Sequence, residues 1–242
     1  MRKTFFISVF WAMVLYGWPV IAQQSSDAWK FRLTPYFVAT TMDGDLTING
    51  RSAAVNVGFA DILENLEFGA MLHFLVEKGP WSIGLDGIYM GLEGTSDDPP
   101  AEASMEQWLV EFTGAYQVKP WLQALAGARY NFLSGDIAFA GRQEREKSGK
   151  VDWIDPVIGM RLAAPLAEKW TVRGRADIGG FGISSDLTWQ LAAYLDFRAS
   201  NLISIIGGYR FLSNDYQTGS GDELFRYDML IFGPALGVSF VF

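Results

Sequence analysis

The chain has a single histidine, His73, and no cysteine, which restricts the chemistry that it can perform. A hydrolase of the serine type needs a hydroxyl group beside a histidine base that a third polar group orients. No serine lies close to His73 in the sequence, and Glu67 and Glu77 are the acids further along its segment on the same alternate positions. We therefore interpret His73 as a packed residue and expect no catalytic, cofactor-binding or metal site. The absence of cysteine also excludes disulfides and thiolate metal sites.

The overall charge argues against nucleic acid as a partner. The formal net charge is −8, with 27 acidic residues against 19 basic ones. Nucleic-acid-binding proteins are basic, at least over one face. Aromatic residues make up 15% of the chain and there are 26 glycines, a composition that suits a membrane-embedded β protein better than a soluble enzyme.

The N-terminus has the layout of an export signal. Arg2 and Lys3 precede an apolar run from Phe5 to Tyr16, and helix-breaking Gly17 and Pro19 lead to a small residue, Ala22. This pattern predicts a signal peptide over residues 1–22 that is cleaved after Ala22, with an uncleaved anchor helix as the alternative. No apolar stretch of membrane-spanning length follows, so residues 23–242 would have to cross a bilayer as a closed barrel.

Bulky apolar residues alternate with small or polar ones from Trp29 to Phe242. Counting back from Phe242, every second residue is bulky, whereas the intervening positions such as Gly237 and Ser239 are small. This period of two predicts strands with one face toward lipid and one toward the lumen. Arginine at Leu236 should therefore be costly, and serine at Gly237 should be tolerated.

The alternation recurs in about ten segments, which predicts an all-β fold, an antiparallel transmembrane β-barrel of about ten strands with eight or twelve as alternatives. The first segment starts at Trp29, and the others lie near Leu66–Glu77, Trp81–Leu92, Glu106–Val118, Leu122–Phe132, Trp153–Ala163, Trp170–Asp177, Leu187–Arg198, Leu202–Leu212 and Phe225–Phe242.

The connections between these segments alternate in length. Those at Lys78–Pro80, Lys119–Pro120 and Ser200–Asn201 are tight, as periplasmic turns are, whereas residues 94–104, 141–150 and 213–223 suit extracellular loops. The first long connection has a hairpin signal at Asn49-Gly50. After it, residues 60–66 suit a short helical or irregular segment folded over or into the barrel mouth.

Several stretches resemble a known family. They are Pro35-Tyr36-Phe37, residues 61–71, residues 153–159, Asp177–Gly182, Ser185–Trp189 and Gly207–Arg210. With them the chain resembles the small bacterial outer-membrane β-barrel proteins of the porin-like or OmpA-like superfamily. The terminal Phe242 is similar to the signal read by the barrel-assembly machinery. The resemblance implies a fold, an outer-membrane location and contact with outer-membrane lipid and lipopolysaccharide, but no activity.

Charged residues of both signs fall on the luminal positions. Since an unpaired charge inside a small barrel costs several kcal/mol, we expect them to pair and fill the lumen. The predicted luminal network is Arg32, Glu67, Asp86, Glu111, Arg129, Asp155, Arg161, Arg173, Arg175, Asp177, Asp196, Arg198 and Arg210.

These features predict a non-enzymatic barrel that contributes to envelope structure, surface binding or limited passage of small solutes. A narrow polar conduit is one variant of this function, and an outer-membrane hydrolase acting on lipid or peptide is the alternative from another class. No small-molecule ligand follows from the sequence.

Overall fold

The computed structural model describes residues 28–97, 100–139 and 147–242, and the predicted signal peptide at 1–22 lies outside these ranges. The elements are β1 (Lys30–Val38), β2 (Thr41–Ile48), β3 (Arg51–Val57), α2 (Phe59–Glu64), β4 (Leu66–Lys78), β5 (Trp81–Asp97), β6 (Pro100–Lys119), β7 (Leu122–Phe139), β8 (Lys147–Ala167), β9 (Trp170–Gly179), β10 (Ser185–Arg198), β11 (Ile203–Thr218), η1 (Gly221–Glu223) and β12 (Phe225–Val241). No helix within the described ranges is long and apolar enough to cross a membrane.

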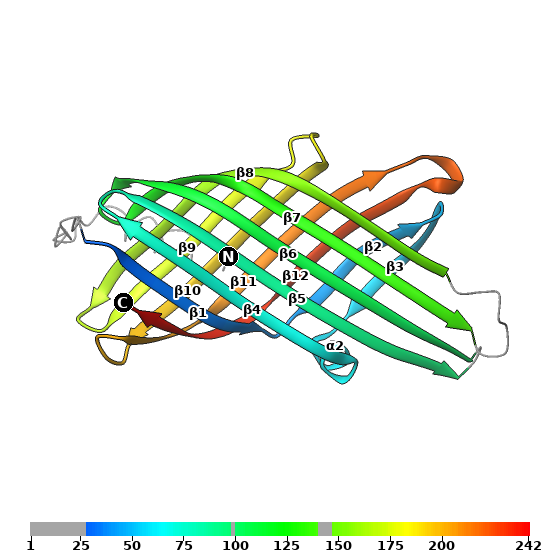
Figure 1. Cartoon of the computed structure of the whole chain (residues 1–242), viewed down its shortest axis with the longest axis horizontal. Coiled ribbons are helices and arrows are strands. Elements are labelled where there is room, and N and C mark those ends of the chain that lie inside the picture. Colours follow the sequence, from blue (N-terminus) through cyan, green and yellow to red (C-terminus); the bar gives the residue numbers. More distant parts are fainter. Residues whose placement is uncertain (1–27, 98–99, 140–146) are drawn as a thin grey trace, which may run out of the picture.

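The strands form one antiparallel sheet that closes on itself (Figure 1). Closure is made by β1, which pairs with β12 through Arg32 opposite Val241 and with β4 through Lys30 opposite Glu77. The strand segments build a ten-stranded wall because β1 and β2 lie end to end along β12, while β3 and β4 form the returning leg. The predicted ten-stranded barrel is confirmed.

The two faces of the wall follow the predicted alternation. On β12, Leu236 and Phe240 point outward and are exposed, whereas Ala235 and Ser239 are buried on the luminal side. Gly237 is also luminal, but a Cβ there would lie 2.8 Å from the Cβ of Tyr36. The expected tolerance of serine at Gly237 was therefore wrong, because the neighbouring strand leaves no room for a side chain.

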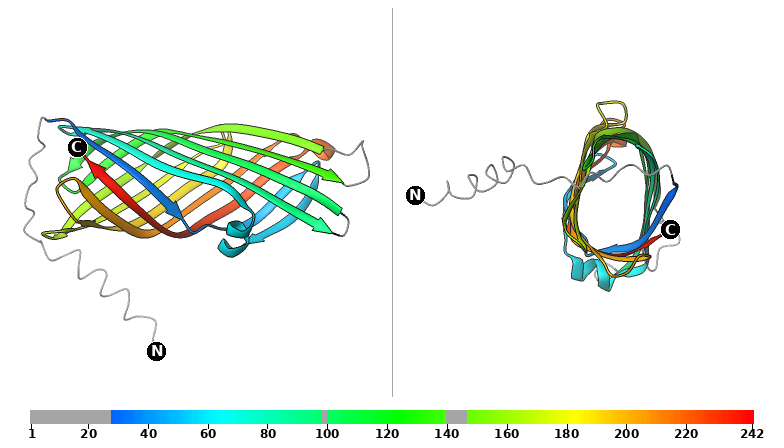
Figure 2. Two further views of the ribbon diagram at one scale, coloured as in Figure 1. Left: turned by 60° about the horizontal axis from the view of Figure 1, so that its bottom comes forward. Right: turned by 90° about the vertical axis from the view of Figure 1, so that its left-hand side faces the viewer.

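The tight turns, the start of β1 and the end of β12 lie at one end of the barrel (Figure 2). Exposed Trp29, Trp81 and Trp170 ring this end, as an interfacial aromatic belt does. Since outer-membrane barrels have short periplasmic turns and longer extracellular loops, we assign this end to the periplasm.

At the opposite end the strands run further than predicted. Much of the loop expected over residues 94–104 is strand, because β5 and β6 remain paired up to Asp97 opposite Pro100, and β11 extends to Thr218. A strand beyond the membrane is held by its backbone hydrogen bonds and needs no apolar outer face. These extensions therefore lack the alternation of apolar and polar residues that marks a membrane crossing. The sequence pattern therefore shows only the part of each strand that faces lipid.

The wall is interrupted where β1 meets β4. Their ladder ends at Pro35 opposite Leu72, and proline has no N–H to extend it. The short helix α2 lies beside this break: its Phe59 packs edge-on against the outward-facing Phe37 with 5.8 Å between ring centroids, while Ile62 is buried inside the barrel. The segment expected over residues 60–66 to be short helical or irregular is thus a helix at Phe59–Glu64, and it lies beside the break in the wall rather than over the mouth.

Candidate functional site: the barrel lumen

The middle of the lumen is filled by a charge network around Arg129 on β7. This guanidinium is fully buried and donates from Nη2 to Glu111 Oε2 and to Asp177 Oδ1, both at 2.7 Å. Its Nη1 donates to the Thr188 hydroxyl at 2.8 Å. The four residues come from β7, β6, β9 and β10, so Arg129 joins strands that do not all touch one another along the wall.

Arg175 completes this central network. It donates to Asp177 Oδ2 at 2.6 Å and forms an ion pair with Glu111 Oε1 at 2.5 Å. Each of the two carboxylates therefore meets two guanidinium groups, and each oxygen of Glu111 has its own arginine. Charge-assisted hydrogen bonds of this kind are the strong ones in a low-dielectric interior.

A second group crosses the lumen to the opposite wall. Arg210 on β11 donates to Asp86 Oδ2 on β5 at 3.1 Å and to the Tyr36 hydroxyl at 2.9 Å. Tyr36 in turn donates to Asp86 Oδ1 at 2.9 Å, and Arg210 Nη2 donates to Gln190 Oε1 at 2.6 Å. These contacts join β1, β5, β10 and β11 across the interior.

Nearer the periplasmic end, Asp196 on β10 is shared by two arginines. Arg173 Nε lies 2.6 Å and Arg32 Nη1 3.3 Å from Asp196 Oδ2. Arg32 is the third residue of β1, so this cluster also joins the first strand to the far side of the barrel.

The remaining predicted luminal residues lie outside these ion pairs. Asp155 faces Arg129 across β7 and β8 but accepts hydrogen bonds from Ser185 and Trp153 instead. Arg161 makes no ion pair among the described residues. It donates only to the Thr113 hydroxyl, at 3.3 Å.

Two residues differ from the expectation. A β-bulge between Leu66 and Phe68 shifts the alternation of β4, so Glu67 is exposed and lies beside the outward-facing Tyr89. Arg198 is exposed at the end of β10, where it donates to the backbone carbonyl of Glu168. Neither residue belongs to the luminal network.

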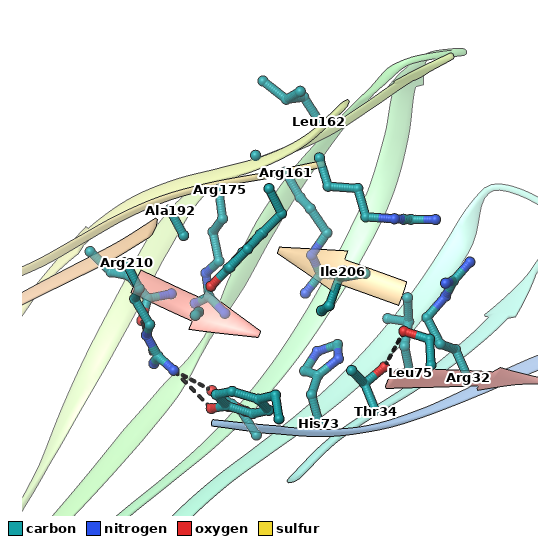
Figure 3. Close-up of a pocket in the computed structure, with 18 of the residues that line it drawn as sticks. Arg32, Thr34, His73, Leu75, Arg161, Leu162, Arg175, Ala192, Ile206 and Arg210 are labelled. Carbon is teal, nitrogen blue, oxygen red and sulfur yellow. Dashed lines mark hydrogen bonds and ion pairs between the residues drawn. The ribbon is translucent and has the colours of Figure 1, made fainter. Parts of the chain in front are cut away.

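His73 lines a cavity of about 130 Å³ in the periplasmic half of the lumen (Figure 3). The fold brings it into cross-strand positions between Thr34 on β1 and Asp86 on β5, a proximity that sequence distance concealed. The Thr34 hydroxyl is bonded to Ser239 at 2.8 Å, and Asp86 is held by Tyr36 and Arg210. None of the side-chain hydrogen bonds among the described residues includes His73, so this row lacks the contacts of a nucleophile, base and orienting acid.

The extracellular half of the lumen contains a buried apolar cluster that the sequence did not lead us to expect. The cluster contains Met42, Ile62, Met90, Leu133, Trp153, Tyr227 and Met229. Buried Gln107, Asn131 and Asn214 lie opposite its members on neighbouring strands. Trp153 stacks on Tyr216 with 4.3 Å between ring centroids. The signal for this layer was present in the sequence as large apolar residues on luminal positions toward the extracellular ends of the strands.

On the outer face of the wall, near the extracellular ends of β11 and β12, a partly exposed ion pair joins these two strands. Arg226 lies 3.1 Å from Asp215 and 3.0 Å from Asp228. Desolvation, with the nearby Asp228 carboxylate, raises the pKa of Asp215 above its ordinary value, while Arg226 opposes this shift. Because Arg226 is 41% exposed, this pair contributes little to stability.

Comparisons with known proteins bear on the fold alone. No family model matches the chain, and no curated protein matches it in sequence. Among solved structures, the outer-membrane protease OmpT from Escherichia coli superimposes with a TM-score of 0.54 at 10% identity, over 89% of this chain and 97% of OmpT. The attachment invasion locus protein Ail of Yersinia pestis gives a TM-score of 0.44 at 7% identity, over 88% of this chain and 98% of Ail.

The closed antiparallel wall, with its apolar outer face, defines a transmembrane β-barrel. With the likeness to OmpT, the fold is that of a bacterial outer-membrane β-barrel.

Proposed function

We propose that this protein is a non-enzymatic outer-membrane barrel with a closed lumen, which contributes to envelope structure and surface binding and passes at most small solutes. The observation that carries the proposal is the central network, in which Arg129, Glu111 and Asp177 are buried and bonded across the interior. The apolar layer toward the extracellular end supports the same conclusion, because packed apolar side chains exclude water and ions.

The proposal includes a route to the membrane. Export would use residues 1–22 with cleavage after Ala22, and assembly would use the barrel-assembly machinery. Phe242, exposed at the end of β12, is the residue that we expect this machinery to read. Outer-membrane lipid and lipopolysaccharide would then cover the apolar outer face, to which exposed Ile158 and Leu191 contribute.

A liposome-swelling assay tests whether the lumen is closed. Vesicles that contain the purified barrel should swell in small sugars no faster than vesicles without protein, because the charge network and the apolar layer both obstruct the pore. Vesicles containing a known general porin provide the positive control. Rapid swelling with the unmodified protein would replace this proposal with a diffusion channel.

The hydrolase alternative has its own test. The solved structure of OmpT is that of a protease, but likeness at this identity bears on the fold alone. We expect no cleavage of peptides or lipids by the wild-type protein and no difference on changing His73 to Gln, because His73 lacks a bonded nucleophile and acid. Activity in the wild type that disappears in His73→Gln would establish an enzyme.

A further inference from the structure

The periplasmic cavity is lined by more cations than anions. Five arginines and one aspartate are among the residues that line it, namely Arg32, Arg161, Arg173, Arg175, Arg210 and Asp86. Five guanidinium groups, those of Arg32, Arg129, Arg173, Arg175 and Arg210, share the carboxylates of Asp86, Glu111, Asp177 and Asp196. Among the described residues, Arg161 makes no ion pair. A surplus of positive charge therefore remains beside this cavity.

Arg161 on β8 carries the clearest part of this surplus. It has no ion pair among the described residues, and its side chain donates a hydrogen bond only to the Thr113 hydroxyl. Its Nη1 is buried without a hydrogen-bond partner in the protein. Gly84 makes room for the group, since a Cβ there would lie 3.3 Å from Arg161 Nη2.

The neighbour of Arg161 across the sheet is another arginine. Arg161 on β8 stands directly opposite Arg175 on β9, and like charges at such positions destabilise a sheet. Water in the cavity can satisfy free N–H groups, but it does not cancel this repulsion. An anion between the two side chains would accept hydrogen bonds from the free N–H groups and would also offset the repulsion between the two arginines.

Further free donors belong to arginines that line the same cavity. Arg175 Nη2 and Arg32 Nε are buried without a partner in the protein, in addition to Arg161 Nη1. Arg32 and Arg173 share the single carboxylate of Asp196. In Figure 3, Arg161 and Arg175 reach into the cavity from neighbouring strands, and Arg32 reaches in from another part of the wall.

We propose that this cavity binds a small oxyanion with two negative charges, of the kind that inorganic phosphate and phosphate monoesters carry. Planar guanidinium groups bind such oxygens through paired N–H donors. A cavity of about 130 Å³ has the volume of about four water molecules at about 30 Å³ each, which is room for one such ion. The ion would enter from the periplasm, since Arg32 and Arg173 lie near the periplasmic ends of β1 and β9.

Isothermal titration of the purified barrel with inorganic phosphate, in detergent at low ionic strength, tests the proposal. We expect saturable binding at one site in the wild type, and affinity weakened by about tenfold or more, a change of about 1.4 kcal/mol, in Arg161→Gln. The matched control is Arg226→Gln, which removes an arginine from the extracellular end and should leave phosphate affinity unchanged. Sodium chloride at equal ionic strength should give no saturable heat.

The fold of the variant is checked by its thermal unfolding. Without phosphate, Arg161→Gln should unfold at the same or a higher temperature than the wild type, because it relieves repulsion from Arg175. Phosphate should then raise the unfolding temperature of the wild type and of Arg226→Gln only. Arg161→Lys provides a second variant that keeps the charge and should retain part of the affinity.

Glycerol 3-phosphate, titrated in parallel, distinguishes the source of the anion. Binding equal to that of phosphate indicates that an esterified phosphate enters, whereas weaker binding restricts the site to the free ion. The proposal is overturned if the wild type shows no phosphate binding beyond the chloride control, or if Arg161→Gln and Arg161→Lys bind phosphate as the wild type does. Neither result depends on whether the lumen conducts.

Discussion

Replacement of Arg129 by alanine should lower the free energy of unfolding by about 3 to 5 kcal/mol. Arg129 is completely buried and is bonded to Glu111, Asp177 and Thr188. Its removal leaves two buried carboxylates with only Arg175 as a common partner, and burying carboxylates with too few partners is the main cost.

A urea titration of the barrel refolded into detergent or lipid measures this loss, with Arg226→Ala as the matched control. Arg226 also contacts two carboxylates, but it is 41% exposed, so its replacement should cost about 1 kcal/mol or less. Equal effects of the two substitutions would show that the central network contributes no more than a surface ion pair.

Replacement of Leu236 by arginine should destabilise the barrel by about 2 to 4 kcal/mol. Leu236 is 63% exposed on the outer face of β12, opposite Phe37 and Gly207 on the neighbouring strands. A guanidinium at that position would have to lie in the hydrocarbon region. Lipid offers it no partner, so the cost is one of desolvation.

The control for this substitution is the adjacent residue with the opposite orientation. Ala235 is luminal and borders the periplasmic cavity, so Ala235→Ser should change the unfolding free energy far less than Leu236→Arg. The comparison is made in the same urea titration in lipid vesicles. A large loss for Ala235→Ser with none for Leu236→Arg would reverse the assignment of the two faces.

The sequence predicts the fold because alternation is a local property. Each outward residue, such as Phe240 or Leu236, differs from its neighbours in sequence in size or polarity. This difference is enough to assign the two faces of a strand and to count the strands. A bulge breaks the rule: Glu67 turned outward because one extra residue between Leu66 and Phe68 shifts the phase. Nothing in the local composition marks that position.

The partners within the lumen could not be predicted from the sequence. Alternation places Arg210 and Asp86 inside the barrel, but their contact depends on how the strands stagger and on the shape of the closed barrel, which bring residues 124 positions apart together. For the same reason Arg161 was expected to pair like the other arginines. Its isolation follows from standing opposite Arg175.

The apolar layer was overlooked for a different reason. A luminal face was expected to be polar, so Met90 and Met229 did not count as a cluster, although both lie on luminal positions. They come from distant strands and meet only because the barrel is closed. Residues 60–66 were expected to be a short helical or irregular segment, but the role of Ile62 in this cluster depends on the interruption of the wall at Pro35.

Single-channel recording in planar bilayers tests the closed lumen most directly. The unmodified protein should give rare or very small current steps at any applied voltage, because the buried arginine and carboxylate groups are paired with one another and the layer above them is apolar. Large, steady steps from the unmodified protein, of the size that general porins give, would contradict this account.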